Sequence, residues 1–223
     1  MKRRSILGSI LAWELGGRPH SELIGILRRI ARRLRDPSDR LELIYAMVDL
    51  GEENFERMIT ELSDIIMDIL RKLSAGELKV LLIYMARACP RCFKSFVKQF
   101  RDNIGTSFSR THFNDIILLV LNIALMNEEA AIFFVNQMSD LIRELAKTEG
   151  FKHFGTVLWY MALMGRANTA KSILRTLLDL MLRKSRCLAE FGDLLFWLFK
   201  GDEELEWETF KLDEQNRWIP FEC

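Results

Sequence analysis

The most closely spaced cysteines in the sequence are Cys89 and Cys92. They form the stretch CPRC, a Cys-x-x-Cys pair, whereas Cys187 and Cys223 stand alone. A zinc site of this kind needs a second pair at ligand spacing, and a thioredoxin-like redox site needs a neighbouring βαβ pattern. The sequence has neither, so we expect two small, half-buried thiols at a turn between helices. The alternatives are a local disulfide in an oxidising or hyperthermophilic cell, and a candidate redox pair.

A second candidate is a set of arginines on one side of a predicted helix. They are Arg28, Arg29, Arg32, Arg33 and Arg35, and the other side of this helix is apolar. Guanidinium groups match the geometry of phosphate oxygens, so this face is a candidate site for phosphate or nucleic acid. Anionic lipid or the acidic surface of a partner protein would fit it as well. The competing interpretation is a solvated outer face whose arginines pair with local acids.

Patterns typical of enzymes are missing from the sequence. His20, His112 and His153 are scattered, and none has a second histidine or a carboxylate at metal-ligand spacing. No glycine-rich phosphate loop, nucleophile elbow or zincin helix occurs. The acidic stretch 201–208 is more typical of a solvated helix start than of a cation site. We therefore expect no catalytic residues, no metal, no cofactor and no enzymatic activity.

Size and charge are those of a folded soluble protein. The chain has 223 residues, 49% of them hydrophobic and 28% charged, with a net charge of +1. The charge is uneven, since residues 1–40 carry ten Lys/Arg against four Asp/Glu and residues 201–223 carry two against eight. The opening residues resemble a secretory signal, but Glu14 interrupts the apolar run and no small-residue cleavage site follows. We expect a cytoplasmic protein without a transmembrane segment.

Apolar runs break at regular intervals along the chain. The breaks fall at Gly16, Gly51, Cys89, Asn127, Gly165 and Gly201, which are 35, 38, 38, 38 and 36 residues apart. Such a period indicates a repeat architecture. Glycine and asparagine are favoured where a helix ends in a left-handed conformation, and Pro90 stops the helix before it and suits the first turn of the next. The stretch Ser74 to Glu77 has the spacing of a capping box that starts a helix.

These signals predict an all-α domain over residues 1–223. We expect an α-solenoid or compact curved array of about six helical hairpins, with units at 1–35, 36–73, 74–108, 109–149, 150–186 and 187–208. Each unit should contain a short helix that is buried almost all round and then a longer amphipathic helix. The tail, residues 209–223, should form a small hairpin or lie extended as a cap.

One unit resembles a tetratricopeptide repeat. In GRANTAKSIL, Gly165, Ala170 and Leu174 match that family's glycine at the turn, small residue five later and bulky residue four beyond. The other units match poorly, and the 38-residue period is nearer that of HEAT-type repeats. The resemblance concerns architecture only, and it implies a scaffold that presents a surface to another protein.

Charge along the second helices favours a protein partner over a nucleic acid. The segments 18–35, 52–72, 90–104, 128–149 and 166–186 carry net charges of +5, −3, +3, −3 and +5. Such alternation suits ion pairs between neighbouring units and interrupts the continuous basic track that a nucleic acid requires. We therefore expect a non-enzymatic binding module for another protein, with head-to-tail self-association through the oppositely charged ends as a further interaction. Nucleic-acid binding through the arginine face, or a HEAT-like DNA glycosylase, is the less favoured alternative.

Overall fold

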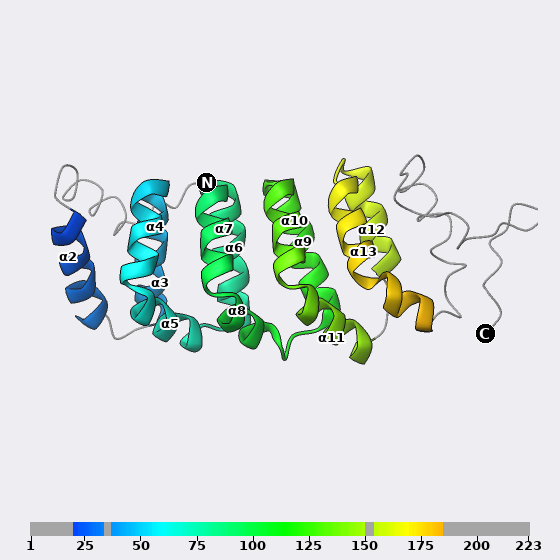
Figure 1. The fold of residues 1–223 in the computed structure, drawn as a ribbon, viewed down its shortest axis with the longest axis horizontal. Helices are drawn as coiled ribbons and strands as arrows, with labels where there is room; N and C mark the ends of the chain where they lie inside the picture. Colours follow the sequence, from blue (N-terminus) through cyan, green and yellow to red (C-terminus); the bar gives the residue numbers. More distant parts are fainter. Residues whose placement is uncertain (1–19, 34–36, 150–153, 185–223) are drawn as a thin grey trace, which may run out of the picture. The chain divides into compact units, whose positions relative to one another are not determined.

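The computed structural model describes residues 20–33, 37–149 and 154–184, and all its regular elements there are α-helices packed against one another (Figure 1). The prediction of an all-α protein is therefore confirmed. The chain divides into two compact units, Met1–Thr111 and His112–Cys223, and each is described by itself. The predicted sixth hairpin, the tail at 209–223 and the helix expected before Gly16 lie outside the described residues.

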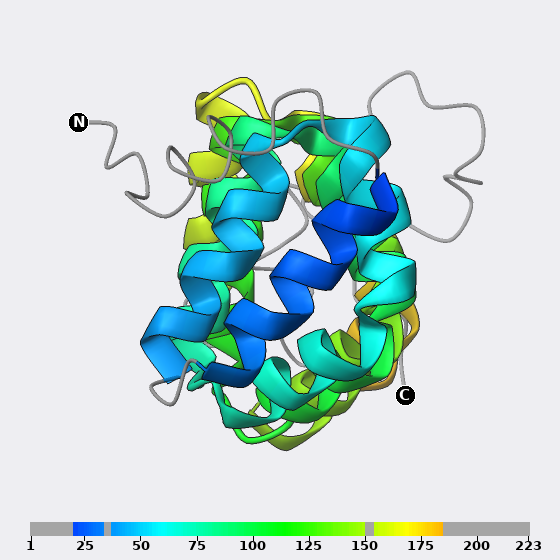
Figure 2. The same ribbon diagram turned by 90° about the vertical axis from the view of Figure 1, so that its left-hand side faces the viewer.

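The first unit contains seven described helices, α2 to α8. Their bounds are His20–Arg33 for α2, Pro37–Asp49 for α3, Glu52–Glu61 for α4, Ser63–Lys72 for α5, Ala75–Ala88 for α6, Pro90–Gln99 for α7 and Arg101–Phe108 for α8. Helix α3 packs on α6 and α4 packs on α7, while α5 packs on α8. Figure 2 shows α2 lying across α3 and α4.

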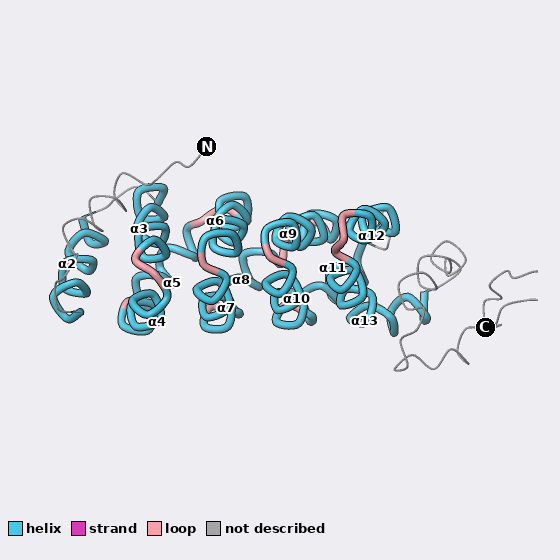
Figure 3. The backbone as a smooth tube through the Cα atoms, turned by 90° about the horizontal axis from the view of Figure 1, so that it is seen from above, coloured by secondary structure: helices cyan, strands magenta, loops and turns pink. Residues whose placement is uncertain are grey.

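The second unit contains five described helices. Their bounds are Phe113–Met126 for α9, Glu128–Gln137 for α10, Ser139–Glu149 for α11, Phe154–Leu163 for α12 and Ala167–Lys184 for α13. Helix α9 packs on α12, and α10 packs on α13. Within each unit the first helices of the hairpins line one side and the second helices line the other, as Figure 3 shows for α9 and α12 against α10 and α13.

The prediction of one long second helix is wrong for three hairpins. It is divided in two at Leu62, Phe100 and Met138, which are spaced 38 residues apart and share nearly the same backbone angles. At Leu62, φ is −108° and ψ is 17°, outside the α-helical region. Each break residue is buried, so the change of direction keeps an apolar side chain in the core. The result is three helices in each of these hairpins, whereas α13 runs through the corresponding position, Thr176.

Side chains from neighbouring helices satisfy carbonyl groups at one of these breaks. The Nε2 of Gln99 on α7 donates to the carbonyl of Ile59 on α4, at 2.9 Å. In a continuous helix that carbonyl would accept from the amide four residues on. Because a buried carbonyl without a partner costs free energy, the side chain of Gln99 helps to make the break at Leu62 tolerable.

The turns between first and second helices use two different solutions. Gly51 and Gly165 have positive φ values of 89° and 73°, which favour glycine. Asn127 is not left-handed as predicted, because its φ is −157°. Its side chain instead caps the following helix, with Oδ1 accepting from the amide of Ala130 at 2.9 Å. The predicted capping box at Ser74 and Glu77 is confirmed at the start of α6.

The core follows the register of the sequence. Ile59, Val97, Val135 and Ile173 are each 2% exposed or less, as are Met47, Met85 and Met161. Small or β-branched residues three places before the turns are also buried, at Val48, Ala86, Ala124 and Ala162. These positions confirm the predicted stripe of core residues, and burying each large apolar side chain contributes about 1.5–3 kcal/mol.

No described helix is both long enough and apolar enough to span a membrane.

Candidate functional site

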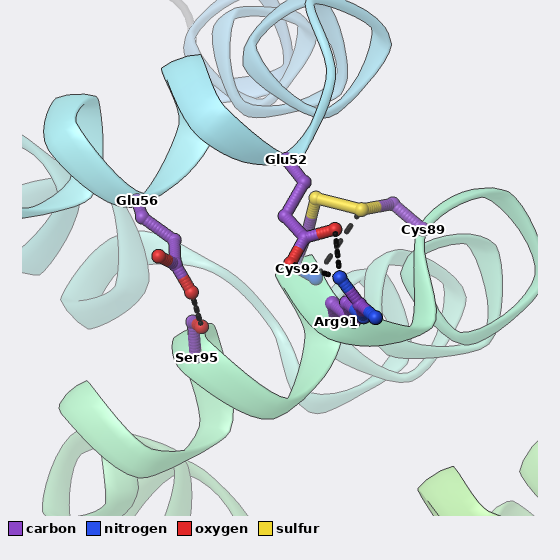
Figure 4. Close-up of polar contacts among 6 residues, drawn as sticks. All are labelled: Glu52, Glu56, Cys89, Arg91, Cys92 and Ser95. Carbon is purple, nitrogen blue, oxygen red and sulfur yellow. Dashed lines mark hydrogen bonds and ion pairs between the residues drawn. A yellow bond between two sulfur atoms is a disulfide. The ribbon is translucent and has the colours of Figure 1, made fainter.

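The turn between α6 and α7 holds the two spaced cysteines. The expectation of two separate thiols is not met, because Sγ of Cys89 is bonded to Sγ of Cys92, with their Cα atoms 5.2 Å apart (Figure 4). Cys89 is the residue that caps α7, and its Sγ also accepts from the amide of Cys92 at 3.2 Å. Pro90 occupies the first helical position, where its missing N–H costs nothing. The pair is therefore a local disulfide at the N-terminus of a helix.

The two cysteines differ in how deeply they are buried. Cys92 is fully buried, while Cys89 is half-buried at the surface of the turn. Attack by an external thiol requires access to the sulfur that is attacked. Cys89 is therefore the member of the pair that an external thiol meets first.

Polar contacts join α7 to α4 beside this turn. Arg91 Nη1 lies 3.2 Å from both carboxylate oxygens of Glu52, and Ser95 Oγ donates to Glu56 at 2.8 Å (Figure 4). Arg91, Ser95 and the Gln99 already described are spaced four residues apart, so they share one face of α7. The alternating charges predicted for the second helices thus meet in an ion pair here. Because the pair is largely exposed, its contribution to stability is small.

The arginine face is only partly described. Arg28 donates from Nη2 to the carbonyl of Glu61 at the end of α4, and the same atom lies 4.0 Å from Asp64. Arg29 donates to the carbonyl of Gly25 in its own helix, and Arg33 is exposed. The side chain of Arg32 and all of Arg35 lie outside the described residues. Arg28 therefore makes contacts within the protein, and these contacts help to hold α2 against α4 and α5.

A tyrosine pair covers the first helices of the first unit. The rings of Tyr45 on α3 and Tyr84 on α6 meet edge to face with centroids 4.8 Å apart. The hydroxyl of Tyr84 donates to Oδ1 of Asp49. Burial raises the pKa of Tyr84 above its usual value, and the hydrogen bond to Asp49 adds to that effect. Burial likewise raises the pKa of Tyr45, with the carboxylates of Glu42 and Glu77 as lesser causes. Both tyrosines therefore stay protonated and serve structure.

The corresponding surface of the second unit is apolar. Its exposed large apolar side chains are Leu118 and Met126 on α9, Tyr160 and Leu163 on α12, and Met164 just after α12. Leu163 is 74% exposed and Tyr160 56%. Met126 matches Met164 in the 38-residue register, while Asn122 and Leu125 of α9 match Tyr160 and Leu163 of α12, and the two helices pack side by side. We call these five exposed side chains the α9/α12 apolar face.

The sequence did not predict this face, because the first helices were expected to be buried almost all round. That expectation is wrong for α9 and α12. The sequence shows a difference at one position of the 38-residue register. Asp49 and Arg87 occupy this position in the first unit, and Leu125 and Leu163 occupy it in the second. Asp49, Arg87 and Leu163 are exposed, and Leu125 is half-buried. This position is therefore charged in the first unit and apolar in the second.

Groups suited to metal chemistry are absent from the part of the chain that the structure describes. No three His, Cys, Asp or Glu side chains there are close enough to hold a metal ion. His112 stands before α9 without capping it through its side chain, and His153 lies outside the described ranges. Comparison with known proteins adds no assignment, since no protein-family model, no curated protein and no solved structure matches the chain.

Proposed function

We propose that the protein is a non-enzymatic binding module that docks another protein on the α9/α12 apolar face. The observation that carries this proposal is the exposure of Leu118 and Met126 on α9, of Tyr160 and Leu163 on the adjacent α12, and of Met164 just after α12. Leaving large apolar side chains in water forgoes about 25 cal/mol for each Å² of apolar surface. Contiguous exposed apolar surface is typical of protein interaction sites.

The composition of the face indicates the chemistry of the partner. Tyrosine and methionine are among the residues enriched in protein interfaces, and the flexible methionine side chain adapts to partners of different shape. At one edge, the half-buried Arg166 directly follows the exposed Met164 and Gly165. Its buried Nε has no hydrogen-bond partner among the described residues. The partner segment that fits carries apolar side chains for the face.

Charge variants at two exposed positions on first helices test the proposal. Leu163→Asp places a charge on the face, and Val80→Asp places one at the exposed position of α6 that matches Leu118 of α9 in the register. Both parent residues are well exposed, at 74% and 59%, so neither substitution should disturb the core. Each variant serves as bait in extracts of the source cells. A protein captured by the wild type is then purified, and its direct affinity for each variant is measured by calorimetry.

The expected result is a loss of affinity of at least tenfold for Leu163→Asp, with Val80→Asp binding like the wild type. Circular dichroism confirms that both variants keep their helix content. Equal affinity of all three proteins for every captured protein would contradict docking on the α9/α12 apolar face. A captured oligonucleotide whose binding falls steeply with salt would instead favour the arginine face of α2.

A further inference from the structure

The disulfide at the start of α7 occupies a turn that does not require a covalent bond. Cys89 and Asn127 hold the same place in the 38-residue register, and both accept a hydrogen bond from the amide three residues on. At the position of Cys92, the next hairpin has the equally buried Ala130. The turn before α10 is therefore built by a side-chain cap over a small buried residue, without a disulfide.

The loop that this disulfide closes is also too short for the cross-link to add much stability. The two cysteines are three residues apart, and the entropy that a cross-link removes from the unfolded chain grows with the length of the loop it closes. Two residues of that loop, Pro90 and Arg91, are already ordered by the start of α7 and by the contact with Glu52. Stability alone gives little reason for a bond at this turn.

The surroundings of Cys89 suit a thiol that reacts reversibly. In the reduced protein, its sulfur remains at the N-terminus of α7, where free backbone amides and the helix dipole stabilise a thiolate. The amide of Cys92 already points at this sulfur, at 3.2 Å. Its partner sulfur is fully buried, so external reagents reach the pair through Cys89. One half-buried and one fully buried cysteine give the thiol exchange a direction.

We propose that Cys89 and Cys92 form a reversible thiol–disulfide exchange site, with Cys89 as the sulfur that bonds to external thiols. A low-molecular-weight thiolate attacks Sγ of Cys89, the S–S bond breaks, and its electron pair leaves on Sγ of Cys92, which takes up a proton. A second thiolate attacks the external sulfur of the mixed disulfide and displaces the Cys89 thiolate, which is protonated in turn. Two external thiols are thereby oxidised to one disulfide, and the protein pair gains two electrons and two protons.

The experiment uses the full chain with Cys187→Ser and Cys223→Ser, so that only the pair remains. The folded protein is equilibrated in mixtures of reduced and oxidised glutathione, quenched with acid, and its free thiols are counted by maleimide labelling and intact mass spectrometry. Two further variants separate the sulfurs. Cys92→Ala leaves Cys89 alone and copies the residue at the matching position of the next hairpin, and Cys89→Ser leaves the buried Cys92 alone.

We expect the pair to pass from fully oxidised to fully reduced across these mixtures while the circular dichroism spectrum stays unchanged. Cys92→Ala should take up one glutathione from oxidised glutathione, as the Cys89 thiolate attacks one sulfur and releases the other as a thiol. Folded Cys89→Ser should take up at least tenfold less and should react fully only in urea. A pair that resists reduction until the protein is unfolded, or a folded Cys92→Ala that takes up no glutathione, would overturn the proposal.

Discussion

The first helices of the two units present different surfaces although they share one sequence register. In the first unit, Tyr84 packs on Tyr45 and donates to Asp49, so polar and aromatic side chains contact one another on that face, beside the exposed Val80. In the second unit, the matching face exposes Tyr160 and Leu163. The same helix geometry thus supports one face whose side chains contact each other and one face whose large apolar side chains are exposed. The two units differ in these side chains while the register is kept.

A core substitution should have the largest effect and tests whether the two units share one packing scheme. Phe96 on α7 and Phe134 on α10 are 38 residues apart and fully buried. Phe96 also contacts the rings of Phe55 and Phe100, with centroids 6.5 and 5.0 Å apart. Replacing either Phe96 or Phe134 by alanine should lower the free energy of unfolding by about 3–5 kcal/mol, since it leaves a cavity in the core.

The measurement for this prediction is urea unfolding followed by tryptophan fluorescence and circular dichroism. The control is Leu163→Ala, which removes an exposed side chain and should change the free energy of unfolding by about 0.5 kcal/mol or less. If Phe134→Ala costs no more than this control, the core register inferred for the second unit is wrong.

A glycine substitution at a turn should have the next largest effect. Gly51 has φ 89° and ψ 168°, in a region that is essentially restricted to glycine. Nothing lies within 4 Å of an added Cβ there, so the cost of Gly51→Ala is one of backbone conformation, about 1–3 kcal/mol. The control is Gly105→Ala inside α8, where an added Cβ also meets nothing within 4 Å. Thermal unfolding should show destabilisation at Gly51 and a gain of about 0.5–1 kcal/mol at Gly105.

Removal of a helix cap tests whether a side-chain hydrogen bond holds the turn before α10, which has no disulfide of the kind found before α7. Asn127→Ala should lower the free energy of unfolding by about 1 kcal/mol, because the amide of Ala130 loses its acceptor. Asn127→Asp keeps an acceptor and is the matched control, expected to stay close to the wild type. Denaturant titrations compare the three proteins, and equal losses for the alanine and aspartate variants would show that the cap is not what holds this turn.

The smallest of the stability effects concerns the tyrosine pair and depends on pH. Tyr84→Phe removes the hydrogen bond to Asp49 and should lower the free energy of unfolding by about 1 kcal/mol at pH 7. Because folding raises the pKa of Tyr84, its contribution is fully present below the pKa of about 10 in the unfolded chain. It is lost as the pH rises from there through the higher pKa of the folded protein.

The difference between wild type and Tyr84→Phe should therefore shrink as urea titrations move from pH 8 to above pH 10. The matched variant Tyr160→Phe removes the hydroxyl of an exposed tyrosine in the second unit. It should leave stability nearly unchanged at pH 7. A difference at Tyr84 that grows with pH would contradict the raised pKa.

Most of the helices could be predicted from the sequence because their signals are local. The turn positions, the capping box at Ser74 and Glu77 and the buried stripe through Ile59 and Val97 follow from propensity and periodicity alone. The breaks at Leu62 and Phe100 could not be predicted in this way. Neither residue is a glycine or proline, and a contact at the first break, from Gln99, comes from the next hairpin.

The site was less predictable because exposure is a property of the packed structure. The sequence identified Cys89 and Cys92 as a pair of interest, but only the structure bonds them and leaves one of them half-buried. The leucine and methionine residues of α9 and α12 look like core residues in the sequence. These side chains are exposed because neighbouring helices cover the other side of α9 and of α12. Amino-acid composition does not show which side will be covered.

The most direct test of the account places a photo-crosslinking amino acid at position 163 in one protein and at position 80 in another, in the source cells. Both positions are exposed and lie on first helices, at 74% and 59%, in different units. If α9 and α12 form a protein-binding surface, irradiation should join a defined protein partner to position 163 and give at least tenfold less of that product at position 80. Equal crosslinking to the same partner from both positions, or no crosslinked partner at position 163, would contradict a protein-binding surface on α9 and α12.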